Sequence, residues 1–387
     1  MRKRTKILAG LLAVGLLLCF AACGSMKTPD GSTPTAGTPQ AGFAAIPADR
    51  IVVGILHITS IQDESGYTYA HHKGFKEMMS ALGLRDDQVV IKDKIDDNNV
   101  TATNNALQEM VDADCDIIFA TSYNYMDSMA NFAAQYPDII FSHCSGFKSN
   151  DVNFNNYFGR IYQGRYLAGI AAGLKMKEAG KPLAGYVAAK GDENSEVTGG
   201  VNAWALGIQS VYPEAEIKVK VTGEWYDPEG EAAAAQALVD AGCFVIGQHC
   251  DTNGPQLKAQ DNGVFGCGYN SDMTEFAPDA HLVAPVWNWG AYYTAAVRSV
   301  IDGTWKPENV FWGMAEDLID ISPLNDKAVA AGTAQAIEGA RAKLIDGSLI
   351  VFGAGLTKSD GTVIDHALTD GEITGGIDYY VKGVSKL

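Results

Sequence analysis

Positive charge is scarce in this sequence, which has 29 Lys and Arg against 46 Asp and Glu over 387 residues. Four of the basic residues lie within residues 1–22, where there is no acidic residue, so the remainder has 25 basic and 46 acidic side chains. A surface this acidic repels phosphate backbones and anionic lipid headgroups. We therefore expect no nucleic-acid partner.

Long apolar runs are also few. The run from Ile7 to Phe20 follows the basic residues of the N-terminus, and it is too short for a stable membrane span. It ends in Leu18-Cys19-Phe20-Ala21-Ala22-Cys23-Gly24, which resembles a lipobox, where small residues precede a cysteine. This pattern predicts a signal peptide over 1–22 and a lipid on Cys23. Cys19 fits less well because Leu18 is bulky; an ordinary signal peptide with an incidental cysteine is the alternative.

Residues 24–47 are rich in Gly, Ser, Thr and Pro and poor in core-forming residues. Such a segment cannot bury enough apolar surface to fold. We expect residues 23–47 to be a lipidated cysteine and a flexible tether with a reach on the order of 25 Å. The body of the protein would then be anchored to the cell membrane on its extracytoplasmic side.

Cysteine beyond Cys23 is sparse and odd in number: Cys115, Cys144, Cys243, Cys250 and Cys267. Each lies in or beside an apolar run, which favours buried free thiols over a disulfide framework. A bridge between Cys250 and either Cys243 or Cys267 is the alternative.

Signatures of catalysis and of metal binding are missing. There is no Gly-x-Ser-x-Gly elbow and no phosphate-binding Gly-x-x-x-x-Gly-Lys-Ser/Thr loop. His71 and His72 are adjacent, so on a helix they point in different directions, and His249-Cys250-Asp251 lacks a second pair of metal ligands. The acids Asp63 and Glu64 suit surface solvation or ligand hydrogen bonds better than acid–base chemistry. We expect neither an enzyme nor a resident cofactor or metal.

Short apolar runs alternate with helical patterns from residue 51 onward. Strands are predicted over 51–56, 116–122, 138–144, 183–189, 216–225, 244–250, 264–270 and 282–289, and helices near 102–112, 128–136, 161–177, 198–211, 229–241 and 254–261, with a further helix through Phe75 to Leu82. Strands separated by helices of this length indicate parallel sheets covered on both faces. The chain is thus predicted to be an α/β protein with two doubly wound lobes.

The residues that follow these strands are the candidates for a binding site, because ligands bind beyond the carboxyl ends of parallel strands. Aromatic side chains are frequent there, with amides and acids between them. Flat apolar faces with a few polar groups suit a planar heterocycle.

A series of short motifs resembles the basic membrane lipoprotein (Med) family. The motifs are Ser65-Gly66-Tyr67-Thr68-Tyr69-Ala70-His71-His72-Lys73-Gly74, Thr121-Ser122-Tyr123, Tyr136-Pro137-Asp138, Gly164-Arg165-Tyr166-Leu167-Ala168-Gly169, Trp225-Tyr226-Asp227-Pro228, Gln248-His249-Cys250-Asp251 and Asp302-Gly303-Thr304-Trp305. The resemblance runs from about residue 50 to the C-terminus. It implies a type I periplasmic-binding fold, two lobes joined by a crossed hinge, that delivers a purine base or nucleoside to an ABC permease. The expected lobes are 48–158 with about 288–320, and 159–287 with about 321–387.

The resemblance also implies site residues. Tyr67 and Trp225 look like the two aromatics that sandwich the base, with a domain-core tryptophan as the alternative for Trp225. Glu64 or Asp63 would supply polar contacts after the first strand. The remaining candidates on the cleft walls are Tyr123, Tyr125 and Glu196, and Glu196 could equally cap a helix.

Two departures from the family's pattern bear on the ligand. Gly268-Tyr269-Asn270-Ser271-Asp272 has Asn270 where nucleoside-binding members have an acid, and Val286-Trp287-Asn288-Trp289 stands where a sugar-binding lysine is expected. The resemblance therefore favours a free base such as adenine, with Asn270, Asp272, Trp287 and Trp289 added to the candidate site. An amide offers both a donor and an acceptor to the edge of a base.

Other functions remain open at this point. The same lipoprotein could be a ligand sensor for a signalling receptor, or a nucleoside hydrolase that uses Asp63 or Glu64 as a base. Another flat ligand, such as a flavin, would also suit aromatic walls. We expect a monomer that binds a purine and contacts a membrane permease.

Overall fold

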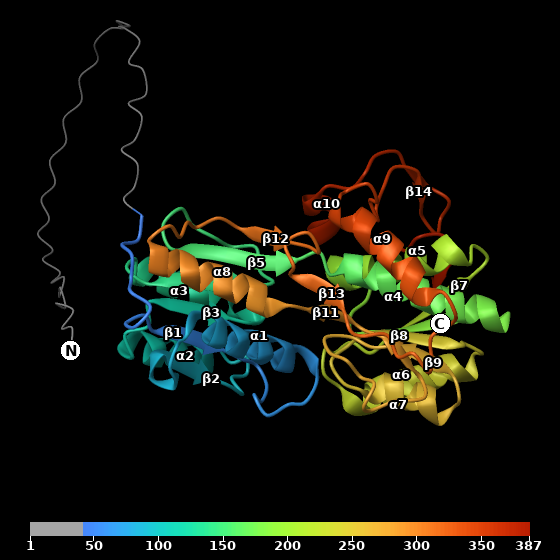
Figure 1. Ribbon diagram of the computed structural model, residues 1–387, viewed down its shortest axis with the longest axis horizontal. Coiled ribbons are helices and arrows are strands. Elements are labelled where there is room, and N and C mark those ends of the chain that lie inside the picture. Colours follow the sequence, from blue (N-terminus) through green and yellow to red (C-terminus); the bar gives the residue numbers. More distant parts are fainter. Residues whose placement is uncertain (1–41) are drawn as a thin grey trace, which may run out of the picture. The chain divides into compact units, whose positions relative to one another are not determined.

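The computed structural model describes residues 42–387, which form two parallel sheets of six strands each (Figure 1). The predicted signal peptide, Cys23 and the predicted tether up to residue 41 lie outside the described residues. Residues 42–47, predicted as the end of a flexible tether, instead pack on the body: the Phe43 and Trp305 ring centroids are 5.5 Å apart, and the Ile46 N–H donates to the Val300 carbonyl at 3.3 Å. None of the helices in the described part of the chain has the length and apolarity that a membrane span needs.

The first lobe is built on a sheet with the strand order β12-β5-β4-β3-β1-β2, in which every pair is parallel. Its strands are β1 (Val53–Leu56), β2 (Val89–Lys92), β3 (Ile117–Ala120), β4 (Ile140–Cys144), β5 (Phe154–Gly159) and β12 (Val310–Trp312). Its helices are α1 (Gly66–Leu82), α2 (Val100–Asp112), α3 (Met126–Gln135) and α8 (Trp289–Asp302), with the 3-10 turns η1 (Asp86–Gln88) and η2 (Tyr123–Tyr125).

Both faces of this sheet are buried, which explains why β1, β3 and β4 read as apolar runs. Successive strand residues point to opposite faces. Accordingly, Ile117 packs into the core with α1 and α8, whereas Ile118 packs into a separate core with α2 and α3.

The second lobe repeats this plan with the strand order β10-β9-β8-β6-β7-β16. Its strands are β6 (Leu183–Ala188), β7 (Glu216–Val221), β8 (Val245–His249), β9 (Phe265–Cys267), β10 (His281–Val283) and β16 (Val384–Lys386). Its helices are α4 (Tyr162–Ala179), α5 (Ser195–Val211), α6 (Pro228–Asp240), α7 (Gly254–Asp261), α9 (Thr333–Ile345) and α10 (Asp370–Gly375), with the small ribbon β14 (Leu356–Thr357) and β15 (Val363–Ile364). The prediction of two doubly wound parallel lobes is confirmed.

Helices α4 and α5 make a very close contact because glycines face each other. A Cβ on Gly169 would lie 2.2 Å from the Trp204 carbonyl oxygen, and one on Gly207 would lie 2.1 Å from the Tyr166 carbonyl oxygen. Neither position accepts a side chain while the backbones keep this separation.

The chain crosses between the lobes after β5, around residue 284 and again beside β13. At the last two places β11 (Pro285–Trp287) and β13 (Ile319–Ile321) form an antiparallel pair between the sheets (Figure 1). The strand predicted over 282–289 is therefore split: β10 ends at Val283 in the second sheet, β11 starts at Pro285, and Trp289 already begins α8. Pro285 has no N–H to continue a ladder, which explains the break.

All five cysteines in the described residues are buried free thiols, as their apolar settings predict.

Candidate ligand-binding cleft

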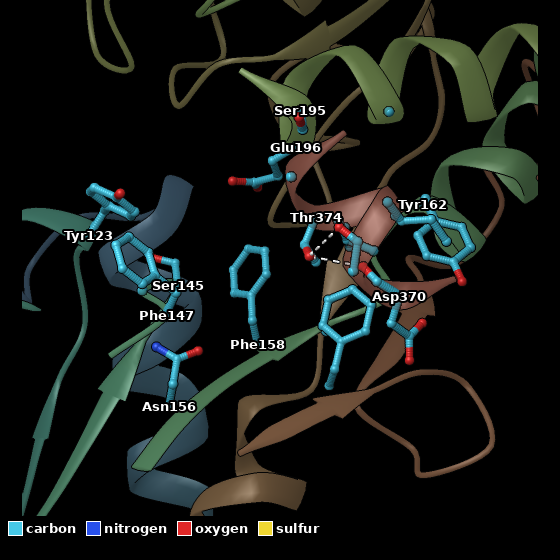
Figure 2. Close-up of a pocket in the computed structure, with 18 of the residues that line it drawn as sticks. Tyr123, Ser145, Phe147, Asn156, Phe158, Tyr162, Ser195, Glu196, Asp370 and Thr374 are labelled. Carbon is cyan, nitrogen blue, oxygen red and sulfur yellow. Dashed lines mark hydrogen bonds between the residues drawn. The ribbon is translucent and has the colours of Figure 1, made fainter. Parts of the chain in front are cut away.

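A cavity of about 720 Å³ lies between the lobes (Figure 2). Its first-lobe wall comes from β5, from β12 and from residues that follow β3 and β4, and its second-lobe wall from the start of α5 and from α10, with the crossing at Ile161 and Tyr162 between them. The labelled residues of Figure 2 that line it are Tyr123, Ser145, Phe147, Asn156, Phe158, Tyr162, Ser195, Glu196, Asp370 and Thr374. The cavity thus lies where the carboxyl ends of the parallel strands predict a binding site.

Glu196 points into this cavity from the first turn of α5 (Figure 2). The side chain that caps α5 is Asn194, which accepts a hydrogen bond from the Val197 N–H at 3.0 Å. The Glu196 carboxyl is therefore free for the cleft, and burial raises its pKa to about 7 although the Arg165 charge opposes the shift. Glu196 Oε1 lies 3.3 Å from Nε2 of His249, whose own pKa burial lowers well below its ordinary value.

Asp251, two residues after the end of β8, is a second acid whose pKa is shifted. Burial raises its pKa to about 8, and the charges of Glu231 and Glu196 add to the shift. Asn270 donates to Asp251 Oδ1 at 2.9 Å. Arg165 stacks over the Tyr269 ring at 4.1 Å and donates to Tyr186 and to a backbone carbonyl. The second lobe therefore presents two carboxyl groups that accept a proton near neutral pH.

Tyr67 and Trp225 lie near these acids from opposite lobes. The Tyr67 hydroxyl donates to Cys144 Sγ at 3.4 Å, and burial, with smaller effects that include the Glu196 charge, raises the pKa of Tyr67 well above its ordinary value. The Trp225 ring is 5.7 Å from that of His249, and the Trp225 carbonyl accepts the Asp251 N–H at 3.0 Å. Tyr67, Trp225 and Asn270 thus lie close to Asp251, His249 and Glu196. Of these residues, only Glu196 lines the 720 Å³ cavity.

The two predicted tyrosines of the first-lobe wall differ. Tyr123 is 50% exposed at the rim of the cavity, with its ring 6.3 Å from that of Phe147, itself 67% exposed. Tyr125 is fully buried in the first-lobe core and donates to the Ile95 carbonyl.

Glu64 and Asp272 are exposed and do not belong to the described residues that line the cavity. Asp272 accepts from Thr274 and lies 3.7 Å from His281, while Asp63 accepts from the Thr59 hydroxyl at 2.7 Å.

Trp287 and Trp289 are buried behind the cleft in a column of stacked rings. Their ring centroids are 4.4 Å apart at 11°, and Trp289 stacks on His71 at 4.2 Å. At the other end of this column, the ring centroids of Phe158 and Trp287 are 5.0 Å apart, and Phe158 presents its ring to the cavity (Figure 2). The tryptophans therefore support the aromatic surface that Phe158 exposes. His71 is held by the Tyr293 hydroxyl at 2.6 Å.

Sequence reasoning missed Phe158, Asn156 and α10. The first two lie on β5, whose sequence FNNYFG is too polar to be recognised as a buried strand. Only the pairing of β5 with β4 and β12 reveals their place. The third feature, α10, lies far along the chain, and Arg160 ties it to the first interlobe crossing through two hydrogen bonds to Asp370, at 3.2 and 2.7 Å.

Within residues 42–387, no group of three or more His, Cys, Asp or Glu side chains is arranged to hold a metal ion.

Solved structures with the same arrangement define the class of fold. An ABC transporter solute-binding protein from Conexibacter woesei superposes with a TM-score of 0.65 at 18% identity, covering 77% of this chain and 97% of that one. A periplasmic solute-binding protein from Actinobacillus succinogenes with bound D-allose gives a TM-score of 0.54 at 13% identity, covering 72% and 99%. The chain has the type I periplasmic-binding fold.

Sequence comparison gives the family. Residues 51–351 match the Bmp family, described as ABC transporter substrate-binding protein PnrA-like, and the chain belongs to it. A purine-binding protein of Brucella abortus is 35% identical over 345 residues, 89% of this chain and 95% of that protein. A putative ABC transporter glucose-binding protein of Haloferax volcanii is 32% identical over 293 residues, 76% and 69% of the two chains.

It follows that the protein is an extracytoplasmic substrate-binding protein of an ABC transporter rather than an enzyme. It binds a small-molecule substrate and works with a permease.

Proposed function

We propose that the substrate is a purine, bound as the free base between Tyr67 and Trp225. The observation that carries this proposal is a pair of carboxyls between the lobes, Glu196 on the cavity wall and Asp251 beside Gly66 of the first lobe, whose pKa values burial raises to about 7 and about 8. A carboxyl near its pKa either accepts an N–H or donates an O–H, and the edge of a purine offers both N–H donors and ring-nitrogen acceptors.

The aromatic side chains supply the remaining affinity. Stacking contributes about 1–3 kcal/mol per base by alanine substitution, and each buried hydrogen bond adds about 1 kcal/mol. Two stacked faces and several hydrogen bonds can therefore reach about 8 kcal/mol, which corresponds to a micromolar Kd.

The choice of base over nucleoside rests on Asn270 and Trp287. Asn270 is neutral and donates one amide N–H to Asp251, while its buried Oδ1 makes no hydrogen bond within the described residues and is left to accept from a ligand. Trp287 is 6% exposed and stacks on Trp289, so it supplies no cation for a ribose. The purine-binding relative from Brucella abortus supports the substrate class, while the glucose-binding name of the Haloferax volcanii relative makes glucose the competitor to test.

The proposal includes a lipid on Cys23 that keeps the protein near its permease. It also includes the division into lobes 48–158 with about 288–320, and 159–287 with about 321–387. Sheet membership supports this division, since β12 joins the first sheet and β16 the second.

Mass spectrometry of ligand released from the purified protein, followed by calorimetry with adenine, adenosine and glucose, tests the proposal. We expect adenine to bind with a micromolar or lower Kd, adenosine more weakly, and glucose not at all. Glucose binding without adenine binding would exclude the purine proposal, and equal Kd values for adenine and adenosine would exclude the preference for the base.

A further inference from the structure

Gly66, the first residue of α1, contacts the opposite lobe through its backbone. A Cβ at this position would lie 2.7 Å from the carbonyl oxygen of Asp251, 3.7 Å from its carbonyl carbon and 3.8 Å from its Cβ. Real Cβ atoms do not approach a backbone oxygen this closely, and a backbone atom cannot rotate away as a side chain does. Any larger residue would push the lobes apart at this point.

The backbone of Gly66 adds a second restriction. Its φ of 86° is in the left-handed region, which glycine adopts without the penalty that other residues incur. Ser65 precedes the helix in extended conformation and makes no side-chain cap. The chain therefore enters α1 in a conformation that directs the Gly66 Cα toward the second lobe.

The opposing residue, Asp251, is held by two residues of the proposed site. The Asp251 N–H donates to the Trp225 carbonyl at 3.0 Å, and its side chain accepts from Asn270 at 2.9 Å. Gly66 is covalently next to Tyr67. The contact between Gly66 and Asp251 consequently connects the segments that carry Tyr67 and Trp225, the two proposed stacking residues.

We propose that Gly66 is a positioning residue for ligand capture: its missing side chain sets how closely the lobes approach and so how closely Tyr67 and Trp225 enclose the substrate. This inference rests on the proposed site between the lobes. Position 66 therefore needs glycine because of the contact between the lobes, whether or not Gly66 touches the ligand.

The chain offers a matched control at the other end of α1. Gly83 has a φ of 65° and caps the same helix, but an added Cβ there would meet nothing within 4 Å. Both glycines have a positive φ, so an alanine at either position strains the backbone, and only Gly66→Ala adds an atom between the lobes.

The experiment compares adenine binding and small-angle scattering for the native protein and both variants. We expect Gly66→Ala to raise the Kd for adenine at least tenfold and to increase the radius of gyration, while Gly83→Ala leaves both within error of the native values. Equal Kd values and equal radii for all three folded proteins would overturn the proposal.

Two further measurements distinguish failure of this proposal from failure of the purine proposal and from misfolding of the Gly66 variant. If native protein binds no adenine, the purine proposal fails and the ligand-free radii alone decide: a larger radius for Gly66→Ala supports the closing contact, and equal radii reject it. If Gly66→Ala does not fold, hydrogen exchange of the native protein with adenine decides. Protection must increase both at Gly66–Thr68 and at Asp251–Asn253, and unchanged exchange at either segment overturns the proposal.

Discussion

Glu196 and Asp251 lie between the lobes where desolvation makes their ionised forms unfavourable. Both carboxyls are largely desolvated and lack a fully matched cation, so the protonated forms are favoured relative to an acid in water. His249 beside Glu196 is neutral for the same reason. Burial thus favours the neutral forms of Glu196, Asp251 and His249, which suits the neutral purine that we propose better than an anion.

This shift has a consequence for stability against pH. Below about pH 4 both acids are protonated in the folded and unfolded chains. Between about pH 4 and pH 8 the folded protein keeps protons that the unfolded chain releases, so the contribution of these acids to the free energy of unfolding falls as pH rises. Above the folded pKa values, about 7 for Glu196 and about 8 for Asp251, the decline ends.

We therefore predict that Glu196→Gln with Asp251→Asn removes a contribution that lowers Tm as pH rises, so that Tm at pH 8 minus Tm at pH 5 is more positive in the ligand-free double variant than in the native protein. Calorimetric scans of both proteins measure this difference. As a control, Asp346→Asn removes an exposed acid whose pKa hydrogen bonds from Ser348 lower, and it should leave this difference unchanged. A pH dependence of Tm that is identical in the double variant and the native protein would contradict this assignment.

Removing one stacking face gives a second prediction. Trp225→Ala should weaken adenine binding by about 5- to 150-fold, because one aromatic face contributes about 1–3 kcal/mol. Isothermal calorimetry measures the Kd, and circular dichroism checks that the fold survives. Tyr226→Ala is the matched control, since the neighbouring ring is 61% exposed and should leave the Kd unchanged. An unaltered affinity in the Trp225 variant would remove its stacking role.

Among the elements, the α4–α5 pair shows how a short distance between backbones depends on glycine. Tyr166 and Trp204 carbonyls occupy the space that side chains at Gly207 and Gly169 would need. The start of α5 carries Glu196, so this packing also positions the second-lobe wall of the cleft.

Gly207→Ala should therefore destabilise the protein by about 1–3 kcal/mol through overpacking. Gly339→Ala, in the middle of α9 with nothing within 4 Å of its added Cβ, should stabilise by about 0.5–1 kcal/mol because alanine favours helix over glycine. Urea denaturation of the two variants tests the contrast. If the free energy of unfolding changed with the same sign in both variants, the close contact between α4 and α5 would not be the cause of the effect at Gly207.

For the whole protein, the lipid anchor is the expectation that the described residues leave untested. Cys23→Ala should abolish incorporation of labelled palmitate and move the protein from the detergent phase to the aqueous phase in a partition assay. Cys19→Ala should keep both properties, because Leu18 makes Cys19 a poor lipidation site. Retained labelling in the Cys23 variant would refute the predicted anchor.

Helices of the body were predictable because their signals are local. Periodicity gave helices near 102–112, 161–177 and 229–241, and the structure has them at Val100–Asp112, Tyr162–Ala179 and Pro228–Asp240. Edge strands β2, β12 and β16 and the polar strand β5 carried weaker signals, since their apolar patterns are short or interrupted.

For the site, the sequence indicated which residue types follow the strands but not their depth. Tyr123 and Tyr125 are two positions apart, yet one is at the rim of the cavity and the other in the core, because η2 turns between them. Trp287 and Trp289 were recognisable as aromatic candidates, but their burial behind Phe158 depends on strands that are far apart in the chain.

The order of residues along the chain was sufficient for the two-lobed parallel architecture and the family motifs, because apolar periodicity and short motifs need only neighbouring residues. It was also the basis for the expected anchor at Cys23. The contact of Gly66 with Asp251, the buried tryptophan column and the shifted pKa values of Glu196 and Asp251 required the tertiary structure. Each of these depends on distances and burial that arise only when segments remote in sequence pack together.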